Sequence, residues 1–586
     1  MKQVEVIAQS KQKTQPHFKL SRLAFSSLLM AGVYCSGLAT AATYEVVPVS
    51  TNDLAINVFA RALDNQNNAV VLAQDAYNPP LDYSLIDFTN TTLLSNLTDA
   101  TAAEAGNPNA DDYNYLVNLV RLTSTENVSS SQQISLYQSF VNDGLNNTRV
   151  TAFDIENLET NGLSFSNDII VNDILNANTL VGSAEAPYIT RQYTNEAGDV
   201  LNYVTNEFVR RGFISLNGNT VELPPQATNL GGVSQAYSVN QNLQVAGSSS
   251  VRASAGFLEA VESCDDDEER GDQALDTCYQ ILKNGGLVTA AMDRRATIWQ
   301  LDAQGQIIST TTFPLPFTPE AVSETNPDTA FFNSAYAIND AGIAVGETHT
   351  FFFDRELKVS SAALYQNNET IEFIDKEDYF PSTALDINNN NIVIGTGTTQ
   401  VNGTNRTKFY TYNVDTEELI FPEDFFPGSA SVARDINDNN MVVGEGEVEF
   451  ANQGIRRKNA FLYDMNTQTF TDLNDLVACD SPYSIVGANS INDDNIILAN
   501  ALVNEQARKP NGDLVVDSDG EPVMIDRVIA VRLNPIPNGV IEDCSSGNND
   551  SINKERQGAS VSLFSGGLLI CVLLSKLVFW RRRQRI

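Results

Sequence analysis

The chain repeats one ten-residue phrase, and this repetition restricts the fold more than any other feature. The phrase occurs as SVNQNLQVAG (238–247), AINDAGIAVG (337–346), DINNNNIVIG (386–395), DINDNNMVVG (435–444) and SINDDNIILA (490–499). Its fixed asparagine recurs at intervals of 99, 49, 49 and 55 residues. Self-similarity at a period of roughly 40–50 residues is typical of propellers and solenoids, in which one supersecondary unit is repeated and stacked.

The segment 211–250 contains one full unit. It divides into four short runs of alternating apolar residues, separated by pieces rich in Asn, Gly and Pro. Such alternation predicts strands joined as hairpins, and the Asn cluster supplies residues that tolerate positive φ in a tight turn. Four antiparallel strands in about 40 residues make one propeller blade. We therefore interpret 211–250 as one blade.

Two weaker copies of the phrase lie upstream, at 61–73 and 173–183, which brings the total to seven. The fold class that we predict for residues 43–544 is all-β, a β-propeller of seven four-stranded blades. Six or eight blades and an open solenoid are the alternatives. We expect an insertion around 80–165, with a helix over ISLYQSFV (134–141), whose apolar residues share one helical face.

The last strand-like run, RVIAVRL (527–533), follows the final phrase and has no blade partners of its own. The run YEVVPVS (44–50) lies at the other end of the repeat region and has the same alternating character. We predict that these two runs pair and close the ring, because closure leaves no open sheet edge.

The N-terminus has the order of a secretory signal peptide. Basic residues precede an apolar run (23–39), which is followed by small residues. We predict a signal peptide over residues 1–42, cut by signal peptidase after Ala41 or Ala42. A lipoprotein modified at Cys35 is the alternative, although a bulky tyrosine stands where a small residue is usual.

The C-terminus predicts a membrane segment. Residues 545–560 are a polar linker, 561–580 are apolar enough to span a bilayer as a helix, and 581–586 form a basic tail. The positive-inside rule keeps the tail cytoplasmic and the propeller outside the inner membrane. The linker end also resembles a Gly-Gly-type sorting signal cut by rhomboid-like proteases, with transfer to the cell surface or medium; a plain anchor is the alternative. The residues of this motif are Gly558, Ala559 and Ser560.

Four cysteines lie between the two end segments, an even number that predicts disulfides in an exported protein. Four cysteines allow three pairings. We choose Cys264–Cys278 and Cys479–Cys544, because each pair then closes one loop or the ring. A zinc site is the competing interpretation, but no suitable Cys/His spacing supports it.

A family resemblance rests on an aromatic-aliphatic run, a Leu-Gly turn (229–232) and the phrase itself. Together they resemble the HAF-type extracellular repeat. Over roughly 44–540 the chain is similar to a family of exported Gram-negative bacterial proteins of unknown function. The resemblance implies the propeller and the compartment, and it implies no activity.

Oxygen-bearing residues at alternate positions open the phrase, as they open a calcium loop. The residues concerned are Asp386, Asn388, Asp435 and Asn437. The central Gly and distal Glu of such a loop are missing, and turn geometry alone explains the Asn. A second group lies in the acidic loop 264–278, namely Asp265, Asp266 and Asp267, where the alternative is a solvated insertion. We expect no cofactor, with calcium as the alternative.

The sequence offers no catalytic motif. His349 is the only histidine outside the leader, so a histidine-based triad or zinc site would rest on that residue alone. The net charge of −37 opposes nucleic-acid binding, because such a surface repels phosphate backbones. We therefore predict a binding module of the envelope or cell surface for a protein partner or a surface polymer. The alternatives are a carboxylate-based hydrolase or lyase in the propeller channel and a structural envelope protein.

Overall fold

The computed structural model describes residues 43–541, except 50–53, 127–129, 158–161, 164–166, 285, 319–328, 353–356 and 451–455. The predicted signal peptide, the linker, the membrane segment and the basic tail all lie outside the described residues. Among the helices that are described, none is long and apolar enough to cross a membrane.

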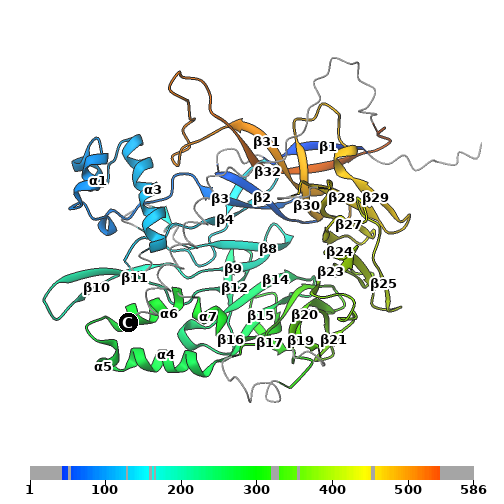
Figure 1. Ribbon diagram of the computed structural model, residues 1–586, viewed down its shortest axis with the longest axis horizontal. Helices are drawn as coiled ribbons and strands as arrows, with labels where there is room; N and C mark the ends of the chain where they lie inside the picture. Colours follow the sequence, from blue (N-terminus) through cyan, green and yellow to red (C-terminus); the bar gives the residue numbers. More distant parts are fainter. Residues whose placement is uncertain are drawn as a thin grey trace, which may run out of the picture. The chain divides into compact units, whose positions relative to one another are not determined.

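The described residues form seven four-stranded antiparallel sheets, and each of these sheets is one propeller blade (Figure 1). Blade A holds β2 (Ala55–Leu63), β3 (Ala69–Ala76), β4 (Tyr137–Asn142) and β5 (Asn147–Arg149). Blade B holds β8 (Ile169–Asn176), β9 (Thr179–Ala184), β12 (Arg211–Leu216) and β13 (Asn219–Leu223). Blade C holds β14 (Ser234–Val239), β15 (Gln244–Ala253), β16 (Met292–Leu301) and β17 (Ile307–Thr312).

The next three blades are the most regular. Blade D holds β18 (Asn333–Ile338), β19 (Ala344–Phe352), β20 (Leu357–Gln366) and β21 (Glu369–Glu372). Blade E holds β22 (Ser382–Ile387), β23 (Ile392–Val401), β24 (Thr404–Asn413) and β25 (Glu418–Ile420). Blade F holds β26 (Ser431–Ile436), β27 (Met441–Glu447), β28 (Lys458–Asp464) and β29 (Thr469–Asp472).

Blade G closes the ring with strands from both ends of the described chain. It holds β30 (Ser484–Ile491), β31 (Ile497–Gln506) and β32 (Met524–Ile536), and its outermost strand is β1 (Thr43–Pro48). The register places Tyr44 opposite Pro535 and Val47 opposite Arg532. The predicted pairing of the two terminal runs is therefore confirmed, and so are the seven blades.

The prediction that 211–250 is one blade was wrong by half a blade. Strands β12 and β13 complete blade B, whereas β14 and β15 begin blade C. Every junction in the unit is an antiparallel hairpin or a short link, so the alternating pattern is the same whichever strand is taken first. The boundary is set by which strands pair, and pairing is not visible in the pattern.

The helix predicted over residues 134–141 was also wrong. This run forms most of β4, which pairs with β3 in blade A. The helices lie upstream: α1 (Thr91–Asn96), α2 (Ala100–Glu104) and α3 (Ala110–Glu126). An eight-residue run fits both the helical and the strand period, and here the open edge of β3 decides in favour of the strand.

The core lies between neighbouring blades. Ile394 and Phe409 of blade E pack against Ala433 and Phe461 of blade F, and all four are fully buried. The glycine that ends the phrase permits close packing of the first two strands. A Cβ at Gly395 would lie 2.1 Å from the carbonyl oxygen of Thr383. Any larger residue would therefore push the second strand away from the first.

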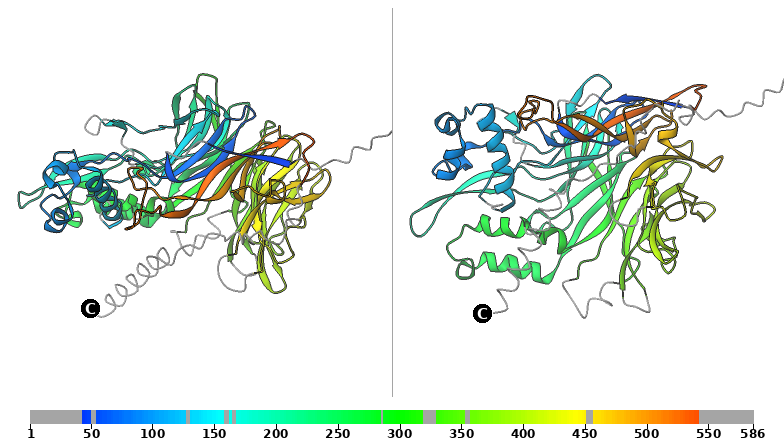
Figure 2. Two further views of the ribbon diagram at one scale, coloured as in Figure 1. Left: turned by 90° about the horizontal axis from the view of Figure 1, so that it is seen from above. Right: turned by 45° about the horizontal axis from the view of Figure 1, so that its top comes forward.

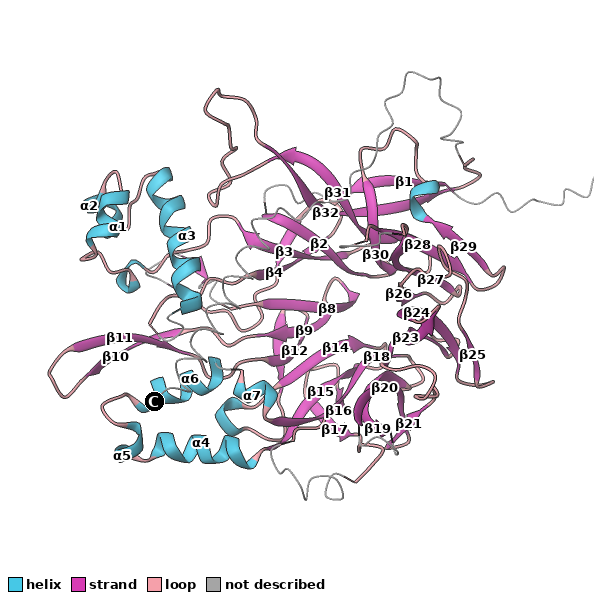
Figure 3. Cartoon of the chain, viewed as in Figure 1, coloured by secondary structure: helices cyan, strands magenta, loops and turns pink. Residues whose placement is uncertain are grey.

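The large insertions share one kind of position in the blade. Blades G, A, B and C each carry one between their second and third strands, at 507–523, 77–136, 185–210 and 254–291. In a blade of consecutive hairpins, these connections lie on the face opposite the phrase turns. Figure 3 shows that helices α1–α7 belong to these insertions. The described insertions include the hairpin β10 (Ile189–Thr194) and β11 (Val200–Thr205), and helices α4 (Ala255–Asp265), α5 (Asp267–Arg270), α6 (Leu275–Asn284) and α7 (Leu287–Ala290).

The helices and the long hairpin of the insertions lie toward the same side of the molecule (Figure 2). Side-chain contacts link the four insertions in sequence around the ring. Lys509 of blade G forms an ion pair with Asp111 of blade A at 3.1 Å. The Tyr193 hydroxyl of blade B donates to Asp272 of blade C at 3.0 Å. The Thr190 hydroxyl links the blade B hairpin to Asp82 of blade A at 3.4 Å. The insertions of four adjacent blades are thus linked to one another.

The cysteines of the acidic loop form a disulfide, Cys264–Cys278, that joins α4 to α6. Cys479 is also disulfide-bonded. Its predicted partner, Cys544, lies outside the described residues.

Candidate functional site

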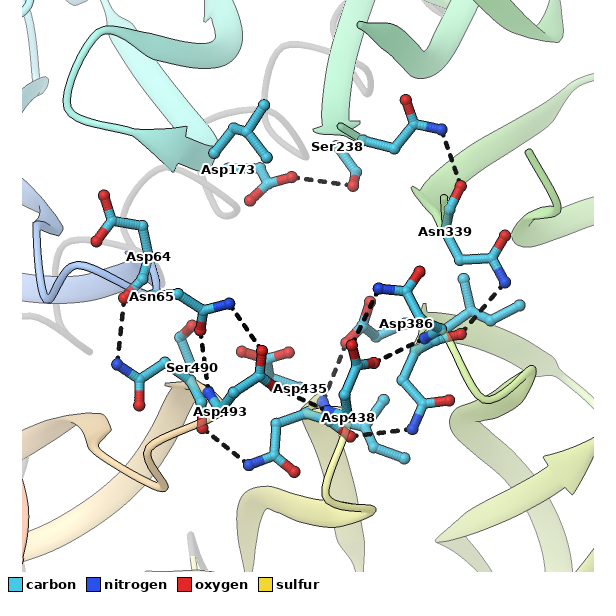
Figure 4. Close-up of a pocket in the computed structure, with 18 of the residues that line it drawn as sticks. Asp64, Asn65, Asp173, Ser238, Asn339, Asp386, Asp435, Asp438, Ser490 and Asp493 are labelled. Carbon is cyan, nitrogen blue, oxygen red and sulfur yellow. Dashed lines mark hydrogen bonds between the residues drawn. The ribbon is translucent and has the colours of Figure 1, made fainter. Parts of the chain in front are cut away.

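The fixed asparagines of the phrase form a belt of hydrogen bonds between blades (Figure 4). In each case the side-chain amide donates to the main-chain carbonyl of the equivalent residue in the next blade. The successive pairs are Asn240–Asn339, Asn339–Asn388, Asn388–Asn437, Asn437–Asn492 and Asn492–Asp64, at 2.8, 3.2, 3.0, 2.8 and 3.2 Å. The belt therefore crosses five of the seven blade junctions. Blade B lacks it because Leu175 occupies the asparagine position.

The same asparagine also shapes its own turn. The Asn388 Oδ1 atom accepts hydrogen bonds from the backbone N–H groups of Asn390 and Ile392 at 3.1 and 2.9 Å. The fourth turn residue, Asn391, has a φ of 59°, a conformation that asparagine tolerates better than most residues. Turn geometry and blade adhesion together explain why asparagine recurs.

The belt accounts for the predicted calcium candidates Asn388 and Asn437 without a cation. The Nδ2 and Oδ1 atoms of both side chains are engaged in hydrogen bonds within the protein. Among the described residues, no group of three or more His, Cys, Asp or Glu side chains is placed to hold a metal ion. Calcium binding at these turns remains a prediction.

Seven aspartates are among the residues that line the pocket of about 220 Å³ at the phrase-turn end of the ring, and three of them stand at equivalent positions in their blades: Asp173, Asp386 and Asp435. Each stands two positions before the asparagine position and accepts a backbone N–H of the next blade. The Oδ2 atom of Asp386 accepts from Ile436 at 3.0 Å, and that of Asp435 accepts from Ile491 at 2.8 Å. These carboxylates therefore tie blades together as the asparagines do.

The two aspartates of blades E and F also contact each other. Burial raises the pKa of Asp386 well above its usual range, and the neighbouring Asp435 carboxyl raises it further. Burial likewise raises the pKa of Asp173. Because two buried carboxyl groups in contact resist double ionisation, this pair holds a proton to higher pH than a solvated aspartate does.

A second set of equivalent residues lies in the innermost strand of each blade, one position before the aspartate position. All seven inner strands have a β-bulge at the equivalent point. We call the seven bulged residues the bulge ring: Arg61, Asn172, Tyr237, Tyr336, Leu385, Arg434 and Asn489. A bulge redirects a side chain out of the regular alternation, and such bulges are common beside functional sites.

A separate carboxyl pair lies at the start of β8 and the end of β9, where blades A and B meet. Asp168 Oδ1 accepts the backbone N–H groups of Leu136 and Tyr137 at 2.8 and 3.0 Å. Glu185 lies 3.5 Å from Arg210. Burial, followed by repulsion from Asp168, raises the pKa of Glu185 to about 7. No sequence motif marks this pair, because its members are 17 residues apart, one just before β8 and the other just after β9.

Helix α6 of the blade C insertion packs with its polar side inward. Gln280 is fully buried and accepts the backbone N–H of Asn206 at 2.9 Å. Lys283 is 9% exposed and donates to the Asn206 carbonyl. Ile281 on the same helix is 50% exposed. This arrangement is the reverse of the usual amphipathic helix of a soluble protein.

Apolar side chains are exposed across the blade B hairpin and the blade C helices. We call this region the insertion surface and define it by Ile189, Val200, Leu201, Leu258, Leu275 and Ile281, which are 38–61% exposed. The acidic loop borders it, and Asp265, Asp266 and Asp267 are all solvent-exposed. Exposed apolar groups surrounded by charge are typical of interaction sites.

His349 lies within β19 and is 6% exposed. Its Nδ1 atom accepts the backbone N–H of Phe332 at 3.2 Å, and its ring packs on the Phe332 ring at 3.7 Å. Burial and the nearby Lys358 lower the pKa of His349 to about 3. A neutral, packed imidazole with its Nδ1 atom engaged has a structural role here.

Three solved structures are similar to this chain at low identity and low TM-score. The β-propeller domain of the Trilobed protease from Pyrococcus furiosus has a TM-score of 0.30 and 11% identity, over 72% of this chain and 90% of that one. The Pyrococcus horikoshii acylaminoacyl peptidase has a TM-score of 0.29 and 11% identity, over 80% of this chain and 52% of that one. An oligogalacturonate lyase in complex with manganese has a TM-score of 0.25 and 9% identity, over 63% of this chain and 97% of that one.

Comparison with curated proteins gave no match. A family model described as "Protein of unknown function (DUF3466)" matches residues 17–583, nearly the whole chain. The chain therefore belongs to the DUF3466 family of proteins of unknown function.

Proposed function

We propose that this protein is an exported binding module whose insertion surface docks a protein partner. The observation that carries the proposal is the inverted helix α6, which buries Gln280 and Lys283 and exposes Leu275 and Ile281. Exposing apolar side chains while burying a lysine is unfavourable in the free protein. A partner that covers the apolar face would recover part of that free energy.

The chemistry of the partner follows from the charge around the apolar residues. Helices α4 and α5 present Glu259, Glu262, Glu268 and Glu269 to solvent, together with the three aspartates of the acidic loop. Arg270 lies among them and is already paired with Asp267. Charge complementarity therefore favours a partner that carries lysine or arginine around an apolar patch. A neutral surface polymer offers neither feature.

The phrase-turn face offers less to a partner. The fixed asparagines of the belt are about 4% exposed, and their amide groups are engaged in hydrogen bonds between blades. Connecting loops on the other face are free to vary without disturbing that belt. Support for the compartment comes from the disulfide Cys264–Cys278, which is characteristic of exported proteins.

Affinity capture tests the proposal. The mature protein is immobilised and exposed to envelope extract beside two variants. One variant carries Leu258→Ser, Leu275→Ser and Ile281→Ser, and the matched control carries Ile308→Ser on β17, where Ile308 is 64% exposed in blade C. We expect one protein to bind the wild type and the control but to be lost from the triple variant. Equal capture by all three proteins, or capture of glycan alone, would contradict the proposal.

A carboxylate-based hydrolase is the second candidate, and the Asp168–Glu185 pair favours it. A carboxyl group with a pKa of about 7, beside Arg210 and Tyr188, has the acidity of a general acid at neutral pH. The test is hydrolysis or lyase activity on peptide and polysaccharide panels with Glu185→Gln as the control. Activity that Glu185→Gln abolishes without loss of folding would favour the enzyme over the binding module.

A further inference from the structure

The bulge ring is connected from blade to blade. The Arg61 Nη2 atom of blade A donates to Asn172 Oδ1 of blade B at 2.5 Å. Asn172 Nδ2 donates to the carbonyl oxygen of Ala236 in blade C at 2.8 Å. The rings of Tyr237 in blade C and Tyr336 in blade D meet edge to face at 5.0 Å. Side chains from four consecutive blades thus meet at one level of the ring.

The two arginines of the bulge ring differ in their partners. Arg434 forms a two-point ion pair with Glu445, through Nε at 3.0 Å and Nη2 at 2.5 Å. Arg61 has no carboxylate within 4 Å among the described residues, and its polar contact is the neutral amide of Asn172. The Arg61 Nε atom is buried and has no hydrogen-bond partner.

Arg61 is thus a partly buried guanidinium without an acid partner in a chain with 73 acidic and 36 basic residues. Removing a cation from water costs several kcal/mol unless an anion or several hydrogen bonds replace the water. The aspartates that follow Asn172 and Arg434 of the bulge ring do not pair with Arg61. Asp173 Oδ2 accepts from the Val239 N–H and the Ser238 hydroxyl, and Asp435 Oδ2 accepts from the Ile491 N–H.

We propose that Arg61 binds a compact oxyanion, a carboxylate or phosphate group of a small ligand, at the centre of the bulge ring. Asn172 holds one side of the guanidinium through Nη2 and leaves the Nη1 atom without an acceptor among the described residues, whereas the Nε atom is enclosed by protein. The terminal donors of an arginine suit such a group. The Arg434 side chain is 42% exposed, so solvent reaches this level of the ring. The tyrosine pair lies on the far side of Asn172 and would contact the body of the ligand.

Calorimetric titration of the full mature protein tests this site with two probes, inorganic phosphate and glucuronate, at constant ionic strength. Glucose serves as the neutral control. We expect saturable binding of at least one anion and none of glucose. Stronger binding of phosphate would assign a phosphate group, and stronger binding of glucuronate a carboxylate. Wild-type protein that binds neither anion would overturn the proposal.

Variants locate the site. Arg61→Gln is expected to weaken binding about tenfold or more, since a charged hydrogen-bonding group is lost. The matched control, Arg252→Gln, removes an arginine that is 47% exposed in blade C and is expected to change nothing. Glu445→Gln frees Arg434 and is expected to tighten binding. Equal anion affinities of the wild type and Arg61→Gln would overturn the proposal. If Arg61→Gln does not fold, Arg61→Lys and Glu445→Gln take its place, and wild-type affinity in both of them would also overturn the proposal.

Discussion

Replacing Asn388 by alanine tests the belt of asparagines at its centre. The side chain is 4% exposed and makes four hydrogen bonds, two within its own turn and two to blade F. Its loss leaves the buried Ile392 N–H and the Asn437 carbonyl without these side-chain partners. A net hydrogen bond contributes about 1 kcal/mol, and an orphaned buried group costs about 1–3 kcal/mol. We therefore expect Asn388→Ala to lower the free energy of unfolding by about 3–5 kcal/mol.

Urea denaturation followed by tryptophan fluorescence measures this loss, provided that the transition stays cooperative. Two further variants separate the contribution of the turn hydrogen bonds from that of the hydrogen bonds to blade F. Asn388→Asp keeps the turn acceptor but loses the donor to blade F, so it is expected to fall between wild type and alanine. Asn390→Ala removes an exposed side chain of the same turn and is expected to cost less than about 1 kcal/mol. If Asn388→Ala costs no more than Asn390→Ala, the asparagine does not hold the blades together.

Three further predictions concern ionisation and processing. The pKa of Glu185 in the folded protein is about 7 against an ordinary 4.5, so its contribution to stability is present below pH 4.5 and is lost as the pH rises to 7. We expect the denaturation midpoint of the wild type to fall over this pH range and that of Glu185→Gln to lack this fall. Parallel curves of midpoint against pH would contradict the prediction. The pKa of Asp386 is shifted in the same direction, upward, so its ionisation destabilises the folded protein as the pH rises. Asp386→Asn can still accept from the Ile436 N–H and can donate to Asp435, and we expect it to raise the melting temperature at pH 7. A lower melting temperature at pH 7 would refute this. Intact mass of the mature protein is expected to show an N-terminus after Ala41 or Ala42 and a C-terminus near Gly558–Ser560, and a chain that still ends at Ile586 would rule out sorting.

The spacing of Asn240, Asn339, Asn388 and Asn437 favoured a propeller over an open solenoid, because a unit of about 50 residues with four alternating runs fits few other folds. Ring closure followed from an unpartnered last run and a matching first one. The blade boundary did not follow, since half-blade and full-blade divisions give the same pattern in every hairpin. Likewise, the run 134–141 fits two periods, and only its pairing with β3 distinguishes them.

The candidate site was less accessible to prediction. Asn388 and Asp386 were identified, but their partners are residues 49 and 50 positions away, so the sequence could not distinguish a clamp between blades from a calcium ligand. Glu185 and Arg61 carry no motif, because their surroundings come from different blades. In helix α6 the sequence shows only that Ile281 and Lys283 occupy different helical faces. Which of the two faces is buried depends on packing, and here the lysine lies inside.

Hydrogen–deuterium exchange of the mature protein, with and without the captured partner, locates the surface to which the partner binds. We predict slower exchange in the β10–β11 hairpin and helices α4–α6 when the partner is bound, with little change in the phrase turns such as 388–392. Slower exchange confined to the phrase turns, with none in α6, would contradict the claim that the insertion surface is where this protein binds.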